Sequence, residues 1–172
     1  DNASYSIPIN RYHPLMKMLR CQFVAASNGG LVQYGQLPPA MPHLNLIGRY
    51  RVIKERDPVL QALLDPKFDP AREVILEQKL AMGEACSGKG TVKLVSQTTD
   101  SLEIEADLAT PQILLITDSY AKGWRAQPLP GSSQQAYELL PANWTLRAVP
   151  LQAGHHHLRV AYDPPAWHWG KW

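Results

Sequence analysis

One stretch of the sequence, residues 113–131, reads ILLITDSYAKGWRAQPLPG and gives the strongest indication of the architecture. It opens with four consecutive apolar residues, Ile113–Ile116, and such an unbroken run is typical of a strand buried on both faces. Polar residues follow at Thr117–Ser119, and the chain then reaches Gly123 and Trp124. The pattern predicts a central strand that leads into a polar loop at one end of a β-sheet.

Blocks on either side of this stretch show the alternation of antiparallel strands. Residues 102–108 alternate apolar with acidic side chains, as expected for a strand with one dry and one wet face. Residues 146–151 and 155–162 form a strand, glycine turn, strand unit. In the second strand the period of two places Tyr162 on the apolar face, so we expect it in the core. Together the blocks predict an antiparallel β-sandwich, similar to a jelly roll, with no helix of three or more turns after residue 91.

The sandwich is expected to span residues 71–172, and residues 1–70 are expected to form a small α/β annex. Pro14–Leu19 predicts a short helix that starts at a proline. Residues 22–26 and 31–34 predict a hairpin. Residues 43–53 predict one strand with a bulge at Gly48.

A second short helix is predicted at the end of the annex. Asp57 and Pro58 suit an N-cap and a first helical residue. The helix should present one apolar face, formed by Val59, Leu60, Leu63 and Leu64. The whole chain is therefore expected to be α+β and mainly β.

The composition limits the classes of function. A chain of 172 residues that is 45% hydrophobic and 19% charged can bury one core. The formal net charge is only +2 and no cluster of Lys and Arg occurs, so we expect no nucleic-acid partner. No apolar run approaches the roughly 20 residues that span a bilayer, and the polar Asp1–Ser4 does not suit a signal peptide. Cys21 and Cys86 are expected to be unbonded.

Two motifs come close to ligand sites but lack parts that their chemistry needs. Residues 83–91 almost match a phosphate-binding loop, yet Gly90 interrupts the required Lys-Thr pair and a strand pattern follows. His155 and His157 would share one face of a strand, about 6.6 Å apart. Zinc needs three or four ligands, however, and no spacing identifies the others. We expect no metal, no cofactor and no catalysis by this segment.

Nine segments and one single residue, in this order and spacing, match one pattern: Leu19–Val24, Leu46–Val52, Phe68–Glu77, Ile113–Ile116, Asp118–Tyr120, Gly123–Ala126, Gly131, Leu146–Pro150, Ala153–His155 and Tyr162–Pro164. They resemble the extracytoplasmic C-terminal region of YfhO-type bacterial membrane proteins, which look like polytopic glycosyltransferases that use a lipid-linked sugar donor. The resemblance spans most of the chain. Two departures are Pro128–Pro130, which stands before Gly131 where the family has valine and aspartate and so predicts a looser loop, and Cys21, where the family has a branched aliphatic residue.

The resemblance implies a location more than an activity. It places this segment at the outer face of the bacterial cytoplasmic membrane, as one compact unit of a larger polytopic protein whose transmembrane part would be its partner. Trp167, Trp169 and Trp172 fall where a membrane helix begins in the family, and tryptophan is typical of the bilayer interface. These three residues are therefore expected to anchor the segment at the interface. The catalytic acids of such transferases lie in loops that this segment does not contain.

The candidate ligand site lies where the central strand ends, because binding residues concentrate in loops held by a rigid sheet. Trp124 would stack on a sugar ring, Asp118 would accept hydrogen bonds from hydroxyl groups, and Arg147 would donate them. Tyr120, which lies beside Asp118 in the sequence, is the fourth residue expected at this site. The expected ligand is a glycan or a lipid-linked sugar acceptor. The alternative is that Asp118 caps a turn and Trp124 fills the core, which would make the domain a structural or protein-interaction module.

Overall fold

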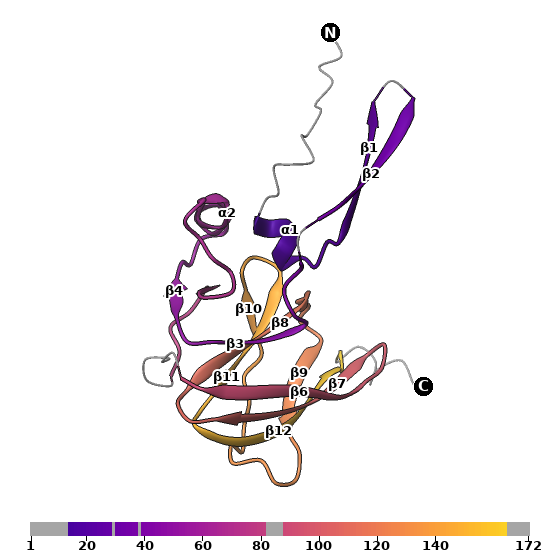
Figure 1. Ribbon diagram of the computed structural model, residues 1–172. Helices are drawn as coiled ribbons and strands as arrows, with labels where there is room; N and C mark the ends of the chain where they lie inside the picture. The colour runs from indigo at the N-terminus through magenta and orange to yellow at the C-terminus, as the bar shows by residue number, and fades with distance from the viewer. Residues whose placement is uncertain (1–13, 29, 38, 82–87, 165–172) are drawn as a thin grey trace, which may run out of the picture.

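The computed structural model describes residues 14–28, 30–37, 39–81 and 88–164 (Figure 1). The described part is mainly strand, as the sequence predicts. Its elements, in chain order, are α1 (Pro14–Met18), β1 (Phe23–Asn28), β2 (Leu31–Gln36), β3 (Leu44–Ile47), β4 (Tyr50–Val52), α2 (Arg56–Leu64), β5 (Val74–Leu76), β6 (Gly90–Gln97), β7 (Ser101–Leu108), β8 (Gln112–Ser119), β9 (Trp124–Pro128), β10 (Leu140–Ala142), β11 (Leu146–Leu151) and β12 (Gly154–Tyr162).

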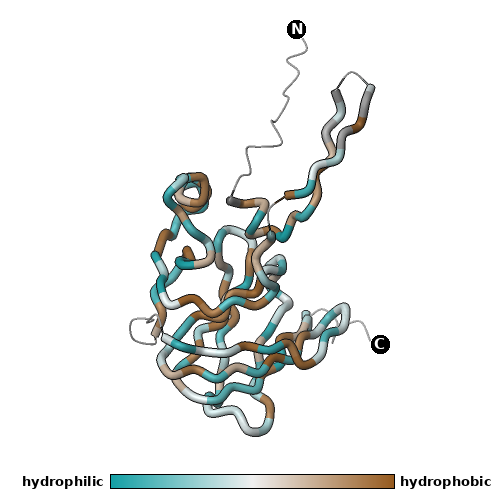
Figure 2. The backbone as a smooth tube through the Cα atoms, viewed as in Figure 1, coloured by the Kyte–Doolittle hydropathy of each residue, from teal (hydrophilic) through white to brown (hydrophobic). Residues whose placement is uncertain are grey.

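Two sheets pack face to face as a sandwich. One has six strands in the order β3-β8-β11-β10-β5-β4, and the other has four in the order β6-β7-β12-β9. Alternate side chains from each sheet meet between them, where Figure 2 shows strongly apolar segments crossing the middle of the molecule. The residues of this core are Leu102, Ile104, Ala106, Leu108, Leu114, Ile116, Val149, Leu151, Leu158 and Val160. The jelly-roll likeness stays a prediction.

Strand β8 is buried on both faces, as its apolar run predicts. Leu114 and Ile116 point into the core between the sheets. Ile113 and Leu115 point the other way, into a second core, and all four side chains are fully buried. The second core lies between the six-stranded sheet and helices α1 and α2, with Met18 and Leu63 among its members. The molecule therefore has a helical layer outside a two-sheet sandwich.

The predicted boundary at residue 70 does not separate the sheets. Strands β3 and β4 come from the first 70 residues, yet both belong to the six-stranded sheet. The prediction of one bulged strand over residues 43–53 is also wrong, because β3 pairs with β8 at one edge of the sheet and β4 pairs in parallel with β5 at the other. Only Gly48 and Arg49 separate the two, so the sheet must curl until its opposite edges come close.

Helix α2 starts two residues earlier than expected. It begins at Arg56, its N-cap is Glu55, and that residue makes no side-chain capping hydrogen bond. Asp57 therefore lies in the first turn, where its negative charge suits the positive end of the helix dipole. Val59 and Leu63 are buried as predicted, whereas Leu64 is exposed.

The turn between β10 and β11 reaches across to a third strand. Asn143 and Trp144 both have positive φ, at 45° and 72°. The Asn143 backbone amide donates to the Ile75 carbonyl at 2.9 Å, and the Ile75 amide donates to Asn143 Oδ1 at 2.7 Å. Asn143 also heads an Asn-Trp-Thr sequence of the N-glycosylation type, but its side chain is 0% exposed. The side chain thus completes the pairing of β5 and is closed to modification in the folded chain.

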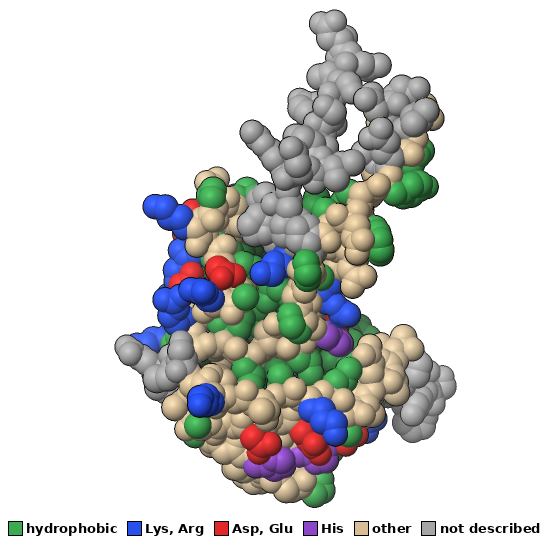
Figure 3. All heavy atoms as spheres, viewed as in Figure 1, with side chains coloured by type: hydrophobic (Ala, Val, Ile, Leu, Met, Phe, Trp, Pro, Cys, Tyr) green, Lys and Arg blue, Asp and Glu red, His purple; other side chains and the backbone are tan. Residues whose placement is uncertain are grey.

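Strands β1 and β2 form a separate two-stranded sheet that projects from the body of the molecule (Figures 1 and 3). Backbone hydrogen bonds hold its base. Leu37 N–H donates to the Gln22 carbonyl at 2.9 Å, and Met41 N–H donates to the Lys17 carbonyl of α1 at 3.0 Å. We call this projecting sheet, residues 23–36, the arm. Within the described residues, no helix has the length and apolar character needed to cross a bilayer.

Candidate functional site

Asp118, at the end of β8, is the centre of a charged cluster. Its Oδ2 lies 2.7 Å from His43 Nε2 and 3.9 Å from Arg147 Nη1. Its Oδ1 lies 4.0 Å from Arg20 Nη1. The carboxylate is about one-third exposed, at 31% of its side-chain surface. One partly open carboxylate is thus surrounded by two arginines and a histidine.

A bulge in β8 aims Asp118 at these partners. Along β11, Leu146 pairs with Ser119, but the next residue, Arg147, pairs with Ile116. Thr117 and Asp118 therefore have no counterpart on β11, and such extra residues bend a strand and redirect its side chains. On the other side of β8, Thr117 N–H donates to the His43 carbonyl at 3.0 Å. The bulge therefore places the Asp118 carboxylate between β11 and the residue that precedes β3.

Arg147 is an almost fully buried cation, with only 5% of its surface exposed. Its Nε donates to the Ser119 carbonyl at 2.8 Å, and its guanidinium lies 3.5 Å from the centre of the Trp124 ring. Burial lowers the pKa of Arg147, and the charge of Asp118 partly opposes that shift. Among the described residues, Arg147 Nη1 has no hydrogen-bond partner. A buried donor of this kind is costly unless something pairs with it.

An aromatic pair lies next to Arg147. The rings of Trp124 and Tyr162 are 5.6 Å apart and tilted by 52°. Trp124 is partly buried against the sandwich core, and Arg147 covers one face of its ring. The prediction that Tyr162 lies in the core is wrong, because it is 46% exposed. A side chain at Gly123 would collide with the Tyr162 ring, so this ring lies over the glycine.

The structure brings three of the four predicted site residues, Asp118, Trp124 and Arg147, into one cluster. Tyr120 is positioned beside them by its backbone, since its amide donates to the Thr145 carbonyl at 2.6 Å. Sequence reasoning missed Arg20 and His43. Each is about 75 or more positions from Asp118 in the chain, as the 75-residue separation of His43 shows, and no motif marks either of them.

Arg20 and His43 also line an open hollow of about 430 Å³ on the side of the cluster that faces the arm. Arg20 reaches Asp118 from the end of α1, where it adopts a positive φ of 59°. Its amide donates to the Lys17 carbonyl at 3.2 Å, which closes the helix with a turn. The other residues around the hollow are Gln22, Gln36, Leu37, Pro39, Ala40, Met41 and Pro42.

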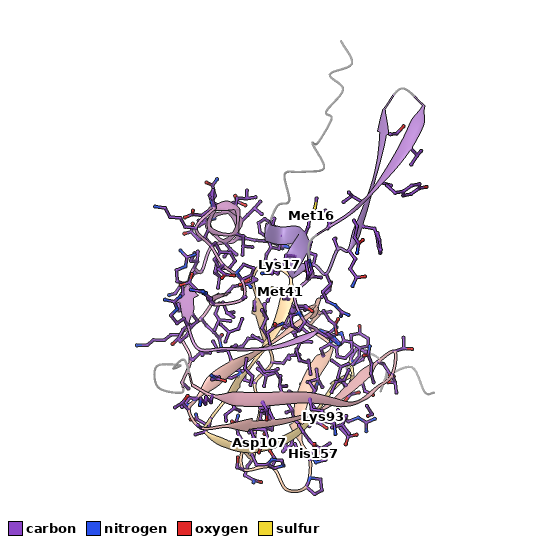
Figure 4. The ribbon with its side chains drawn as sticks, viewed as in Figure 1. Met16, Lys17, Met41, Lys93, Asp107 and His157 are labelled. Carbon is purple, nitrogen blue, oxygen red and sulfur yellow. The ribbon has the colours of Figure 1, made fainter. Side chains whose placement is uncertain are left out.

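A second polar cluster lies on β7 and β12, at the end of the molecule away from α1 (Figure 4). His155 Nδ1 lies 2.8 Å from Asp107 Oδ1, and His157 Nε2 lies 2.8 Å from Glu103 Oε1. His156 points inward and contacts the Tyr137 hydroxyl at 2.8 Å. Among the described residues, no three His, Cys, Asp or Glu side chains converge as metal ligands would.

The His157–Glu103 pair predicts a stability that depends on pH. The hydrogen bond that His157 Nε2–H donates to the Glu103 carboxylate raises the pKa of His157 above 6.5 and lowers the pKa of Glu103 below 4.5. The raised pKa of His157 stabilises the fold below pH 6.5, and this stabilisation is lost as the pH rises through the pKa of His157 in the folded protein. The lowered pKa of Glu103 stabilises the fold above pH 4.5, and this stabilisation is lost as the pH falls through the pKa of Glu103 in the folded protein.

Replacing His157 with Gln should therefore lower the melting temperature most between about pH 4.5 and pH 6.5, and much less at about pH 8.5. Thermal denaturation of both proteins across this range measures the difference. Glu103→Gln should lose the same pH-dependent part, and the double variant should lose no more. The same loss at every pH would contradict the charged pair.

Cys21 is a free thiol, as expected, whereas Cys86 lies outside the described residues. Trp167, Trp169 and Trp172, the expected membrane anchors, lie outside them as well. Comparisons of the chain with models of protein families, with curated proteins and with solved structures find no match.

Proposed function

We propose that this chain is a non-catalytic accessory domain of a glycosyltransferase-like membrane protein, and that it binds a glycan at the Asp118 cluster. The observation that carries the binding proposal is Arg147. It is a buried cation whose Nη1 has no hydrogen-bond partner among the described residues. It lies 3.9 Å from the partly open Asp118 carboxylate and next to an aromatic pair. Acceptors, donors and an exposed ring within one small area are the groups that recognise sugars.

The chemistry of each group suggests its role. Asp118 accepts hydrogen bonds from sugar hydroxyl groups, and Arg20, which is 44% exposed at its side chain, donates to them. Of the two rings, Tyr162 is the open one, so it provides the stacking surface that the sequence assigned to Trp124. Trp124 instead packs against the Tyr162 ring, and the cation–π contact with its own ring holds the Arg147 guanidinium in place.

The proposed location rests on the resemblance to YfhO-type proteins. The domain would lie at the outer face of the bacterial cytoplasmic membrane, with the transmembrane part of the same polypeptide as its partner. A glycan or a lipid-linked sugar acceptor would then reach the Asp118 cluster from the membrane side. The domain would orient this acceptor for a reaction catalysed elsewhere in the protein.

A structural module without a ligand is the second candidate, and one observation favours it. The Asp118 carboxylate already has three partners within the chain, from β11, the end of α1 and the residue before β3. Such a network would join the arm and the helical layer to the sandwich. In that case the cluster would serve stability alone.

Two substitutions distinguish these functions. Tyr162→Ala should change the free energy of unfolding by less than about 1 kcal/mol and abolish binding on a glycan array. Trp124→Ala should cost roughly 3–5 kcal/mol, because it removes a large ring from the edge of the core. Tyr34→Ala is the matched control, since it removes an exposed tyrosine from the arm. It should leave glycan binding unchanged.

Glycan arrays and chemical denaturation provide the two measurements. A wild-type chain that binds no glycan, together with a strong loss of stability in Asp118→Asn, would refute the binding proposal. That combination would leave the structural module standing.

A further inference from the structure

The arm exposes a stripe of large apolar side chains on one face. In the register of β1 and β2, Ala25 faces Tyr34 and Ser27 faces Val32, so these positions share a face with Phe23. Tyr34 is 80% exposed, Phe23 67% and Val32 51%. In the body, the interior of each sheet is covered by another layer. Among the described residues, no such layer covers the arm.

The arm is also free of charge. From Cys21 to Pro42 the sequence contains no Asp, Glu, Lys or Arg. Natural sheet edges are usually protected against association by charged residues or by proline, and residues 23–36 have neither. A two-stranded hairpin on its own is at best marginally stable in water. These properties indicate that the arm has a partner of apolar character.

Charge distribution indicates what this partner is. The arm projects from the end of the body where α1 and α2 lie (Figure 1). Over residues 14–80 the sequence has nine Lys and Arg against six Asp and Glu, and over residues 88–164 it has six against seven. Lys17 lies directly at the base of the arm (Figure 4). Acidic and histidine side chains gather at the opposite end (Figure 3).

From this arrangement we propose that the arm docks on an anionic lipid surface. Phe23, Tyr34 and Val32 enter the interfacial region of the bilayer, where amphipathic aromatic rings are favoured. Lys17, at the base of the arm, faces the lipid phosphates, to which its charge is attracted over about one Debye length. The open strand edges remain at headgroup depth, because unpaired backbone groups are not tolerated in hydrocarbon.

This inference goes beyond glycan binding and uses different residues. It also provides an orientation for the body. With the arm in the interface, the hollow next to Arg20 and His43 faces the membrane, and the acidic end formed by β7 and β12 points away from it. The two proposals can therefore fail independently.

Vesicle co-sedimentation tests the proposal. The whole 172-residue chain should bind vesicles of phosphatidylcholine with phosphatidylglycerol more tightly than vesicles of phosphatidylcholine alone. Raising the salt from about 0.1 M to about 1 M, which shortens the Debye length from about 10 Å to about 3 Å, should weaken the binding. Phe23→Ser combined with Tyr34→Ser should weaken it by about tenfold or more, since burying one large apolar side chain alone provides about that factor.

The matched control is Val95→Ser, which removes an exposed apolar side chain from β6, away from the arm. It should bind the vesicles like the wild type, and circular dichroism should show that both variants keep the wild-type fold. Absent binding, or binding that the arm variant retains, would overturn the proposal. So would a dimer in sedimentation equilibrium that depends on Phe23 and Tyr34 and ignores vesicles, because the partner would then be a second copy of the chain.

Discussion

Replacing Leu115 with Ala is expected to lower the free energy of unfolding by about 2–5 kcal/mol, and replacing its neighbour Leu114 is expected to lower it by a similar amount. Both side chains are fully buried. Leu114 fills the core between the two sheets, and Leu115 fills the core under α1 and α2. Each substitution removes the same atoms and leaves a cavity in a different layer.

Equality of the two losses is the informative result. In a sandwich with one wet face, neighbouring residues of a strand alternate between large and small effects, because one side chain of each pair faces water. Equilibrium unfolding in urea measures both variants. Val95→Ala on the exposed side of β6 is the control and should stay within about 0.5 kcal/mol of the wild type. A small loss at Leu115 would contradict the helical layer.

The second large effect is expected at Asn143, where Ala should cost about 3 kcal/mol. The substitution removes Oδ1, the acceptor of the Ile75 amide at 2.7 Å. The Ile75 amide, which loses its acceptor, is buried, and an unsatisfied buried donor costs about 1–3 kcal/mol. Ala must also adopt the positive φ of 45° that Asn143 has. Asparagine tolerates this region, whereas alanine is strained there by roughly 1–2 kcal/mol.

Asn143→Gly separates these two causes. Glycine loses the same acceptor but adopts a positive φ without strain, so it should be more stable than the Ala variant by up to about 1 kcal/mol. Denaturant unfolding of the three proteins gives both differences. If the Ala variant unfolds like the wild type, the Ile75 amide has another acceptor and the role assigned to Asn143 is wrong.

The local sequence pattern correctly predicted those strands whose buried faces do not depend on long-range contacts. The apolar run of β8 and the alternation of β7 fix their faces without reference to any partner. Gly48 is a position where the local sequence pattern does not determine the structure. A glycine between two apolar pairs looks the same in a bulge and in a turn that sends the chain to the far edge of a sheet, and only the pairing of β4 with β5 decides between them.

The residues of the candidate site also fall into two groups, those that the local sequence pattern could indicate and those that only long-range contacts bring together. Asp118 and Trp124 follow the apolar run closely in the sequence. Arg147 lies in β11, from which a short turn leads to β12 of the other sheet, the neighbour of β9. Arg20 and His43 are brought in by the packing of α1 and β3, which no spacing in the sequence indicates. Tyr162 follows the alternation of β12, yet it sits at the last position of the strand, beyond the cover of the opposite sheet.

The curled six-stranded sheet has a consequence for the order in which the chain can fold. Its first strand, β3, pairs with β8, and β8 pairs with β11, so residues 44–47 have no partner until residues near 113 exist. The central β8–β11 pair needs the chain as far as Leu151. The chain must lose the conformational entropy of closing such long loops before the strand contacts contribute favourable free energy. This requirement slows folding. During synthesis the arm, whose two strands are neighbours in sequence, can pair at once, whereas most of the first half of the protein must wait for the second.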